Sequence, residues 1–235
     1  MKTVGIHQPE YLPWLGFFKK MMSSELFVFL DDAQFRKKGW QNRNRIRIKN
    51  GTTLLSIPVH AHSYPDINDV TIDNQKNWST RHKKSILFNY ASAPFFDEIK
   101  DFIESIFNKK FEYLVDLNTE IIKFIMKELD IKSELCFSSE LEIEKKGSDR
   151  VLDICKAVDA DNYITGTFWA ESNLRIEEFK KSNINVEFQK FQHPIYNQIH
   201  GEFIPDMSII DLLFNEGKTA AKKILQTASV SSRTA

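Results

Sequence analysis

Two short apolar runs near the start of the chain, each ending in polar residues, constrain the fold more than any other feature. TVGIHQ (residues 3–8) and LFVFLDD (26–32) are separated by LGFFKKMMSS, which can form a short helix. Neither run alternates apolar with polar residues, as expected for strands that are covered on both faces. A strand, a helical crossover and a second strand form a βαβ unit with parallel strands. The sequence therefore predicts a parallel sheet covered by helices.

The later segments extend this pattern and interrupt it twice. Residues 42–59 alternate arginine with isoleucine before Asn50–Gly51, which indicates a β-hairpin with one solvent-exposed face. Further on, apolar residues recur three and four positions apart, as in amphipathic helices. Strand and helix patterns then alternate again. We predict an α/β protein with a mostly parallel, open, Rossmann-like sheet, a β-hairpin insertion and a helical segment. The predicted organisation is a single domain at 1–220, with its helical elaboration at about 77–130, and a flexible tail at 221–235.

Charge and hydropathy argue against several classes of partner. Lys plus Arg and Asp plus Glu are equal at 32 each, so no overall field favours nucleic acid or an anionic membrane. The N-terminus has no long apolar stretch and no run of about 18 apolar residues follows, so we expect a cytoplasmic protein without membrane insertion. His60 and His62 have no third ligand at a recognisable spacing. We therefore expect them to be surface histidines, and we expect no metal site.

Polar residues follow three of the predicted strands. They are His7 and Gln8, then Asp31 and Asp32, and finally Thr165 and Gly166 at the end of NYITG. The carboxyl ends of parallel strands meet at one edge of an open sheet, where ligands bind, so we expect these residues to line one cleft. A lone histidine is more often structural, and an isolated Asp pair more often starts a turn. Where a histidine and a carboxylate lie side by side, however, the carboxylate can fix the tautomer of the imidazole and raise its basicity, which suits general-base chemistry.

A basic run lies between Ala33 and Asn50, where every charged residue is Lys or Arg. It is equally compatible with a solvated hairpin face and with a local anion cradle, in which Arg side chains bind phosphate or carboxylate and Trp40 or Phe35 stacks on a ring. Interleaved basic and aromatic residues also occur in single-stranded nucleic-acid sites. The neutral net charge and the short extent of the run favour a small anionic ligand.

Side chains capable of hydrogen bonding gather again in the last third of the chain. Asn173 follows NYITG, and QHPIYNQIH supplies His193, Tyr196 and Gln198. Pro194 restrains His193 to an extended backbone, so this segment is predicted to be a loop. We expect it to close the pocket, although loops are polar in most proteins.

Four motifs carry a specific resemblance: HQPEYLPWLGFF, LDDAQFRKKGWQNRNRIR, YITGTFWAESNL and FQHPIYNQIHGEFIPDMSIIDLLFNEG. Together, from about Thr3 to Gly217, they resemble the WbqC-like family of bacterial polysaccharide and O-antigen loci. Members lie beside enzymes that make nucleotide-linked 3-amino-3,6-dideoxyhexoses, so the resemblance implies modification of a sugar amine. N-formylation of a dTDP-linked sugar by 10-formyltetrahydrofolate is the most economical such step. The chain lacks the HxSLLPxxxG pattern of the familiar formyltransferases that use this donor, so formyl transfer here would need a different scaffold.

N-acyl transfer, with formyl transfer as its expected form, assigns roles to these residues. The attacking amine must be neutral, and the oxyanion of the tetrahedral intermediate must be held. His7 is the expected base, with Asp31 or Asp32 as its orienting partner and Asn42 or Asn44 as an oxyanion donor. Arg43 and Arg45 would hold the diphosphate, while Trp40 or Trp14 would stack on the base or the pterin. The other expected substrate contacts are Gln8, Tyr11, Gln34, Thr165, Gly166, Asn173, His193, Tyr196 and Gln198.

Two other functions stay open on the sequence. A nucleotidylyltransferase or ATP-dependent ligase of the HxGH class also has a histidine after its first strand, but His7 is followed by PEYLPWLG and not by GH. A non-catalytic sugar-nucleotide-binding protein would use the same polar residues without turnover. For the leading hypothesis the expected partners are a nucleotide-linked amino sugar and a small-molecule acyl donor, with no nucleic acid. Formation of a homodimer stays open.

Overall fold

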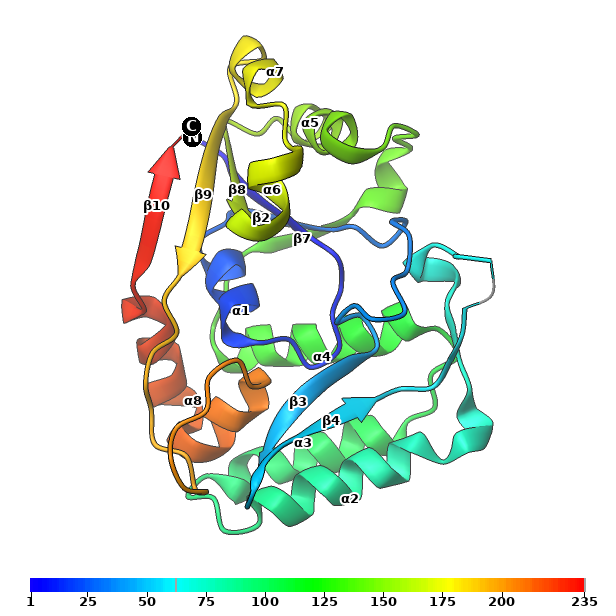
Figure 1. Cartoon of the computed structure of the whole chain (residues 1–235), viewed down its shortest axis with the longest axis vertical. Coiled ribbons are helices and arrows are strands. Elements are labelled where there is room, and N and C mark those ends of the chain that lie inside the picture. Colours follow the sequence, from blue (N-terminus) through cyan, green and yellow to red (C-terminus); the bar gives the residue numbers. More distant parts are fainter. Residues whose placement is uncertain (62, 235) are drawn as a thin grey trace.

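A twisted sheet forms the centre of the computed structural model, which describes residues 1–61 and 63–234 (Figure 1). The strand order is β10-β9-β8-β1-β2-β7, with five neighbouring strands parallel and β10 antiparallel to β9. The strands are β1 (Thr3–His7), β2 (Leu26–Phe29), β7 (Glu134–Phe137), β8 (Asn162–Gly166), β9 (Asn185–Phe191) and β10 (Val230–Thr234). The predicted mostly parallel α/β fold is confirmed. His62 lies outside the described residues.

The two faces of the sheet contact different helices, because alternate strand residues point to opposite sides. Phe27 and Phe29 of β2 belong to a core with α1 (Leu15–Met22) and α8 (Ile209–Thr227). Leu26 and Val28 belong to a second core on the other face. The helices of this second face are α5 (Gly147–Ala157), α6 (Thr167–Asn173) and α7 (Ile176–Lys181), which lie together in Figure 1.

The order of the strands changes direction at β1. From β1 the chain continues to β2 and then β7, and it later returns to the other side of β1 as β8 and β9. Right-handed crossovers that proceed in opposite directions cover opposite faces of a sheet, which explains why α1 and α5 lie in different cores. The loops after β1 and β8 therefore diverge, and this topological switch point favours a ligand crevice at their carboxyl ends.

The hairpin and the helical segment lie on the α1 side of the sheet (Figure 1). The hairpin pairs β3 (Arg43–Ile48) with β4 (Gly51–Ser56), and Gly51 has the positive φ of 116° that such a turn requires. The region expected to be helical at about 77–130 contains α2 (Trp78–Tyr90), α3 (Phe96–Asn108) and α4 (Leu114–Glu128). Between the hairpin and α2 a short ladder joins β5 (Val59–His60) to β6 (Thr71–Ile72), with 3-10 turns at Ile67–Asp69 and Asn74–Lys76. A further 3-10 turn at Ser138–Leu141 follows β7.

Residues 221–234 form a helix end and a strand, whereas their small polar residues suggested a flexible tail at 221–235. Helix α8 continues to Thr227, with Ala221 and Leu225 four positions apart and both buried. Strand β10 then pairs antiparallel with β9, whose main-chain groups would otherwise be exposed at the edge of the sheet. The apolar face of α8 and this open edge therefore order residues that look featureless in isolation. Nowhere in the described ranges is a helix both long and apolar enough to span a membrane.

Candidate functional site

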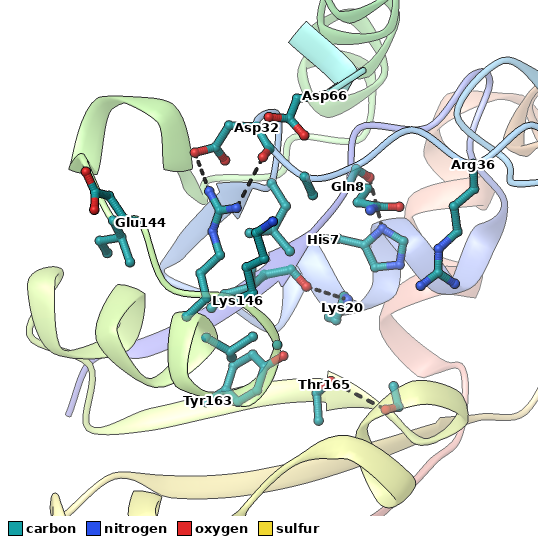
Figure 2. Close-up of a pocket in the computed structure, with 18 residues that line it drawn as sticks. His7, Gln8, Lys20, Asp32, Arg36, Asp66, Glu144, Lys146, Tyr163 and Thr165 are labelled. Atoms are coloured by element: carbon teal, nitrogen blue, oxygen red, sulfur yellow. Dashed lines mark hydrogen bonds and ion pairs between the residues drawn. The ribbon is translucent and has the colours of Figure 1, made fainter. Parts of the chain in front are cut away.

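A cavity of about 760 Å³ opens at the carboxyl ends of β1, β2 and β8 (Figure 2). Its volume lies within the range of roughly 300–1,000 Å³ that is typical of small-molecule sites. The ends of these strands and the loops that follow them contribute the expected His7, Gln8, Asp32, Thr165 and Gly166 to its lining. The cavity thus lies at the switch point between β1 and β8, and strand-end residues far apart in sequence share it. Their functional roles remain predictions.

His7 stands at the end of β1 with a defined tautomer. Its Nδ1 lies 3.0 Å from the main-chain carbonyl oxygen of Gln8, which only accepts hydrogen bonds, so Nδ1 carries the proton. The ring packs edge-on against Phe17 at 5.2 Å between centroids. Burial, and then the charge of Lys20, lower the pKa of His7 to about 3. At neutral pH His7 therefore presents an unprotonated Nε2 that can accept a hydrogen bond.

Lys20 on α1 is a buried member of the cavity lining that the sequence analysis did not identify. Its side chain is only 5% exposed, and its Nζ donates to the main-chain carbonyl of Ile6 over 3.1 Å. Figure 2 shows Lys20 beside His7 and between β1 and the Thr165 wall of the cavity. Burial lowers the pKa of Lys20 to about 7, while the charge of Glu10 acts in the opposite direction. The sequence did indicate that Lys20 is on the buried side of the helix, since it follows Phe17 by three positions and so shares the apolar face.

Glu10 is the carboxylate recorded next to His7, at 3.9 Å between Oε1 and Nδ1. Its side chain is buried, and its Oε2 has no hydrogen-bond partner among the described residues. Burial raises the pKa of Glu10 to about 7, against the opposing effect of Lys20. His7, Glu10 and Lys20 therefore form a cluster of three titratable side chains, of which His7 and Lys20 line the cavity and Glu10 lies outside its lining.

Asp31 and Asp32 do not take the expected position as orienting partners of His7. Asp31 accepts from the Ser139 main-chain N–H at 3.1 Å and from the Ser139 hydroxyl at 2.6 Å. Asp32 pairs with the Arg150 guanidinium and accepts from the Ser138 hydroxyl. The reason is the sheet order: β7 is the neighbour of β2, so the serines that follow β7 lie beside the carboxylates that follow β2. Only Asp32 of the two lines the cavity.

The expected oxyanion donors, Asn42 and Asn44, are buried outside the cavity lining. Asn42 donates through its amide to the Ile57 carbonyl over 2.8 Å. Asn44 donates to the carbonyls of Tyr11 and Leu12. Both amides thus satisfy main-chain groups where the hairpin meets its neighbours, which corrects the predicted role.

The basic run is divided among three environments. Arg36 alone of its cations lines the cavity. Arg43 and Arg45 instead place their guanidinium groups over the half-exposed Trp40 ring, at 5.7 and 5.4 Å from its centroid. Arg47 is 3% exposed and donates to several main-chain carbonyls. The expected cradle of Arg43, Arg45 and Trp40 is therefore a cluster outside the cavity lining, with Arg45 and Trp40 at the surface.

The loop expected to close the pocket packs elsewhere. Tyr196 and Gln198 both donate to Asp211 Oδ2, over 2.7 and 2.8 Å, and so attach the loop to α8. His193 Nδ1 lies 2.9 Å from the Pro194 carbonyl. None of these three residues lines the cavity, and Asn173 at the end of α6 is also outside its lining.

Three aromatic or amide contacts predicted for substrate are also placed outside the cavity. The buried Tyr11 hydroxyl lies 2.9 Å from His82 Nδ1. Trp14 packs edge-on against Phe191 at 5.4 Å. Gln34 is exposed, and its main chain forms an isolated antiparallel β-bridge with Asp66. Tyr11 and Trp14 thus pack in the loop after β1, and Gln34 lies in the loop after β2, so none of the three reaches the cavity lining.

Comparison with known proteins agrees with the motifs at these strand ends. A model of the WbqC-like protein family matches residues 8–223. The chain belongs to the WbqC-like protein family. It is also similar to a protein of Mycobacterium tuberculosis (strain ATCC 25618 / H37Rv), named Uncharacterized protein Rv1507c, with 32% identity over 224 residues that cover 94% of this chain and 96% of the relative. No solved structure matches the chain.

The cavity of this WbqC-like chain contains several charged residues that sequence reasoning missed or left unassigned. Arg150 of α5 pairs with Asp32, and Tyr163 of β8 lies on the same wall as Thr165 (Figure 2). The other charged lining residues are Arg36, Asp66, Glu144 and Lys146. Apolar side chains such as Ile143 and Val151 complete the wall. The lining thus combines charged groups of both signs with apolar side chains, as small-molecule sites do.

Proposed function

We propose that this WbqC-like chain is an N-acyltransferase that acts on the amino group of a dTDP-linked 3-amino-3,6-dideoxyhexose in O-antigen or polysaccharide biosynthesis. The acyl group in this proposal is formyl, and the donor is 10-formyltetrahydrofolate. The donor supplies an electrophilic carbonyl carbon, and the amine of the sugar forms the new bond.

The observation that carries the proposal is the neutral His7 at the switch-point cavity. Its Nδ1–H is directed to the Gln8 carbonyl, so the Nε2 lone pair is free of that contact. A lone pair at this position can accept an N–H from the sugar amine and orient the nitrogen for attack. With a pKa of about 3, His7 holds a proton poorly at neutral pH. We therefore assign it the role of orienting acceptor, in place of the expected base.

The remainder of the lining fits the two ligands. Arg36 and Lys146 are cations suited to a diphosphate or to the carboxylates of a folate tail. Arg150 is already paired with Asp32, so it helps to hold the wall more than to bind a free anion. Ile143 and Val151 offer apolar contacts for a base or a pterin ring. The fit rests on the chemistry of these side chains and on the volume of the cavity.

The test is incubation of the purified protein with dTDP-linked 3-amino-3,6-dideoxyhexoses and one of three donor systems: 10-formyltetrahydrofolate, acetyl-CoA, or ATP plus amino acids. The product is weighed by mass spectrometry, and pyrophosphate is measured in parallel. We expect the sugar nucleotide to gain one formyl group, only with the formyl donor.

The other outcomes each contradict a defined part of the proposal. A gain of one acetyl group keeps N-acyl transfer and overturns the formyl donor. Pyrophosphate release favours nucleotidylyl or ligase chemistry. Tight binding of the sugar nucleotide without product from any donor favours a non-catalytic binding protein.

A further inference from the structure

Two consecutive lysines on α1 lie in opposite environments. Lys19 Nζ donates to the carbonyls of Leu225 and Gln226, 2.9 Å each, near the end of α8. It therefore joins two helices, and it does not line the cavity. Lys20 lines the cavity and is buried, and its Nζ donates to the Ile6 carbonyl. The two side chains provide a matched pair for experiment.

The position of Lys20 is unusual for a side chain that only stabilises the fold. Its Nζ lies 5.8 Å from the centre of the Phe27 ring, and no carboxylate within 4.0 Å pairs with it in the part of the chain that the structure describes. A buried ammonium group without a close counter-ion is costly, and the usual response is loss of the proton. A single carbonyl acceptor leaves the amine free to face the cavity.

The charged and titratable groups around Lys20 come from several elements. His7 ends β1, and Glu10 lies in the loop before α1. The charge of Lys20 lowers the pKa of both side chains, and the charge of Glu10 raises the pKa of Lys20. Across the cavity lie Tyr163 of β8 and Arg150 of α5. Asp32, Arg36 and Asp66 lie on the side of the loop after β2, and Glu144 and Lys146 precede α5. Since burial already lowers the pKa of Lys20 to about 7 against the attraction of Glu10, a substantial fraction of the amine is neutral near neutral pH.

We propose that Lys20 Nζ is the catalytic proton acceptor of this cavity, taking the proton that the substrate amine loses when it attacks the acyl carbon. The inference rests on the proposed function and adds to it a residue that acts directly on the reacting nitrogen. His7 Nε2 orients the amine, and Lys20 Nζ removes its proton. Glu10 is a positioning residue that acts through the charge of Lys20.

The step balances without a further reactant. A C–N bond forms between the sugar amine and the acyl carbon, and the bond from that carbon to the donor nitrogen breaks. The amine proton moves to the lone pair of Lys20 Nζ, and the resulting ammonium gives a proton to the departing nitrogen. Lys20 is neutral again at the end of the cycle, as a base that becomes an acid must be.

The first experiment compares Lys20→Met, Lys20→Arg, Lys20→Ala and the control Lys19→Met with the wild type in the mass-spectrometric transfer assay. We expect each Lys20 variant to lose about 10²–10⁴-fold in turnover, the range for a lost general base, and Lys19→Met to stay within a few-fold of the wild type. Added methylamine should restore part of the activity of Lys20→Ala by supplying the missing base. Wild-type turnover in Lys20→Met, with its near-ultraviolet circular dichroism intact, would overturn the proposal.

A second experiment needs no turnover and uses the wild-type protein. Trace acetic anhydride is applied across a range of pH, and acetylation of Lys19 and Lys20 is quantified by peptide mass spectrometry, with each residue serving as a reference for the other. We expect the labelling midpoint of Lys20 near pH 7, well below that of Lys19, and slower labelling of Lys20 when the dTDP-amino sugar is present.

The two experiments separate this inference from the proposed function. If no donor gives product but Lys20 labels near pH 7 and is protected by the sugar nucleotide, formyl transfer is overturned while Lys20 stands as the neutral amine of the site. If Lys20 labels no earlier than Lys19, or only after unfolding, the assignment of Lys20 is overturned even where formyl transfer is observed.

Discussion

The side-chain amide of Asn44 donates to the main-chain carbonyl of Leu12 over 2.7 Å, and Leu12 is a non-glycine residue with a positive φ of 44°. The same amide also donates to the Tyr11 carbonyl at 3.2 Å. An L-residue in this left-handed region is strained, so it persists only where its surroundings hold it. Asn44 on the hairpin thus fixes the loop that leads from the cavity to α1.

Asn44→Ala is therefore expected to lower the free energy of unfolding by about 1–3 kcal/mol, because two buried carbonyls lose their donor. The measurement is urea denaturation followed by circular dichroism. Asn197→Ala, at an exposed position in the later loop, is the control and should change stability by less than about 0.5 kcal/mol. Equal stability of the two variants would show that the contact contributes nothing.

Arg47→Met should destabilise the protein far more than Arg45→Met, although both arginines belong to the same alternating run. Arg47 donates to the carbonyls of Ile48, Gly51, His200 and Glu202 and to the Gln198 side chain. We expect a loss of about 3 kcal/mol or more for Arg47→Met, since several buried acceptors lose a charged donor. The exposed Arg45 should give about 0.5 kcal/mol or less. Faster hydrogen exchange in residues 198–204 of the Arg47 variant would locate the effect, and unchanged exchange there would contradict it.

Arg36→Ala should weaken binding of a dTDP-linked sugar, because Arg36 is the cation of the basic run that lines the cavity. The expected loss is roughly 1.5–3 kcal/mol, the scale for a hydrogen bond to a charged group. Isothermal titration calorimetry is the measurement, and Arg45→Ala is the control because its guanidinium lies over Trp40 instead. A larger loss with Arg45→Ala than with Arg36→Ala would restore the surface cluster as the anion site.

His7→Ala should reduce turnover about 10²-fold, the scale for losing an orienting contact, while nucleotide-sugar affinity changes little. His7→Gln should lose less, since its side-chain oxygen can accept a hydrogen bond near the position of Nε2. Melting temperature, affinity and turnover are to be measured on the same preparations. A stably folded His7→Ala with wild-type turnover would remove His7 from the reaction.

Stability should fall with acidification partly through His82, which lies against Tyr11 in the core. Burial lowers the pKa of His82 from 6.5 to about 4. Between these values the unfolded chain binds more protons than the folded one, so the free energy of unfolding decreases as the pH falls from 6.5 to 4. In His82→Gln this contribution is absent, and the stability difference between wild type and variant should change by up to about 1.4 kcal/mol per pH unit in this window. Parallel curves would contradict the assigned pKa.

The sequence was sufficient to predict the sheet and one edge of the site. Non-alternating runs that end at His7 and Asp32 predict parallel strands, and parallel strands bring their carboxyl ends together whatever the detailed packing. For this reason the shared cavity of His7, Asp32 and Thr165 could be expected without knowing the strand order.

What the sequence could not supply was the choice of partner for each side chain. Asp31 accepts from Ser139, which is distant in sequence, only because β7 lies next to β2. Arg45 and Arg47 lie on the same face of β3, yet Arg45 lies over Trp40 whereas Arg47 is buried by the segment around His200 and Glu202. Lys20 was not among the expected site residues, and the cavity that it lines is completed by Tyr163 and Thr165 of the distant strand β8. Each of these outcomes is decided by contacts between distant segments.

The pairing of β1 with β8 also has a consequence for the order in which the molecule acquires its site. Thr3 lies opposite Asn162, so the wall formed by Tyr163 and Thr165 closes only after a long stretch of chain has been synthesised. Closing so large a loop has an entropic cost that local helix formation avoids, which places this pairing among the slower steps of folding. During synthesis the Lys20 face of α1 has no opposite wall until β8 has been made. A nascent chain that ends before β8 therefore exposes an apolar surface to which chaperones can bind.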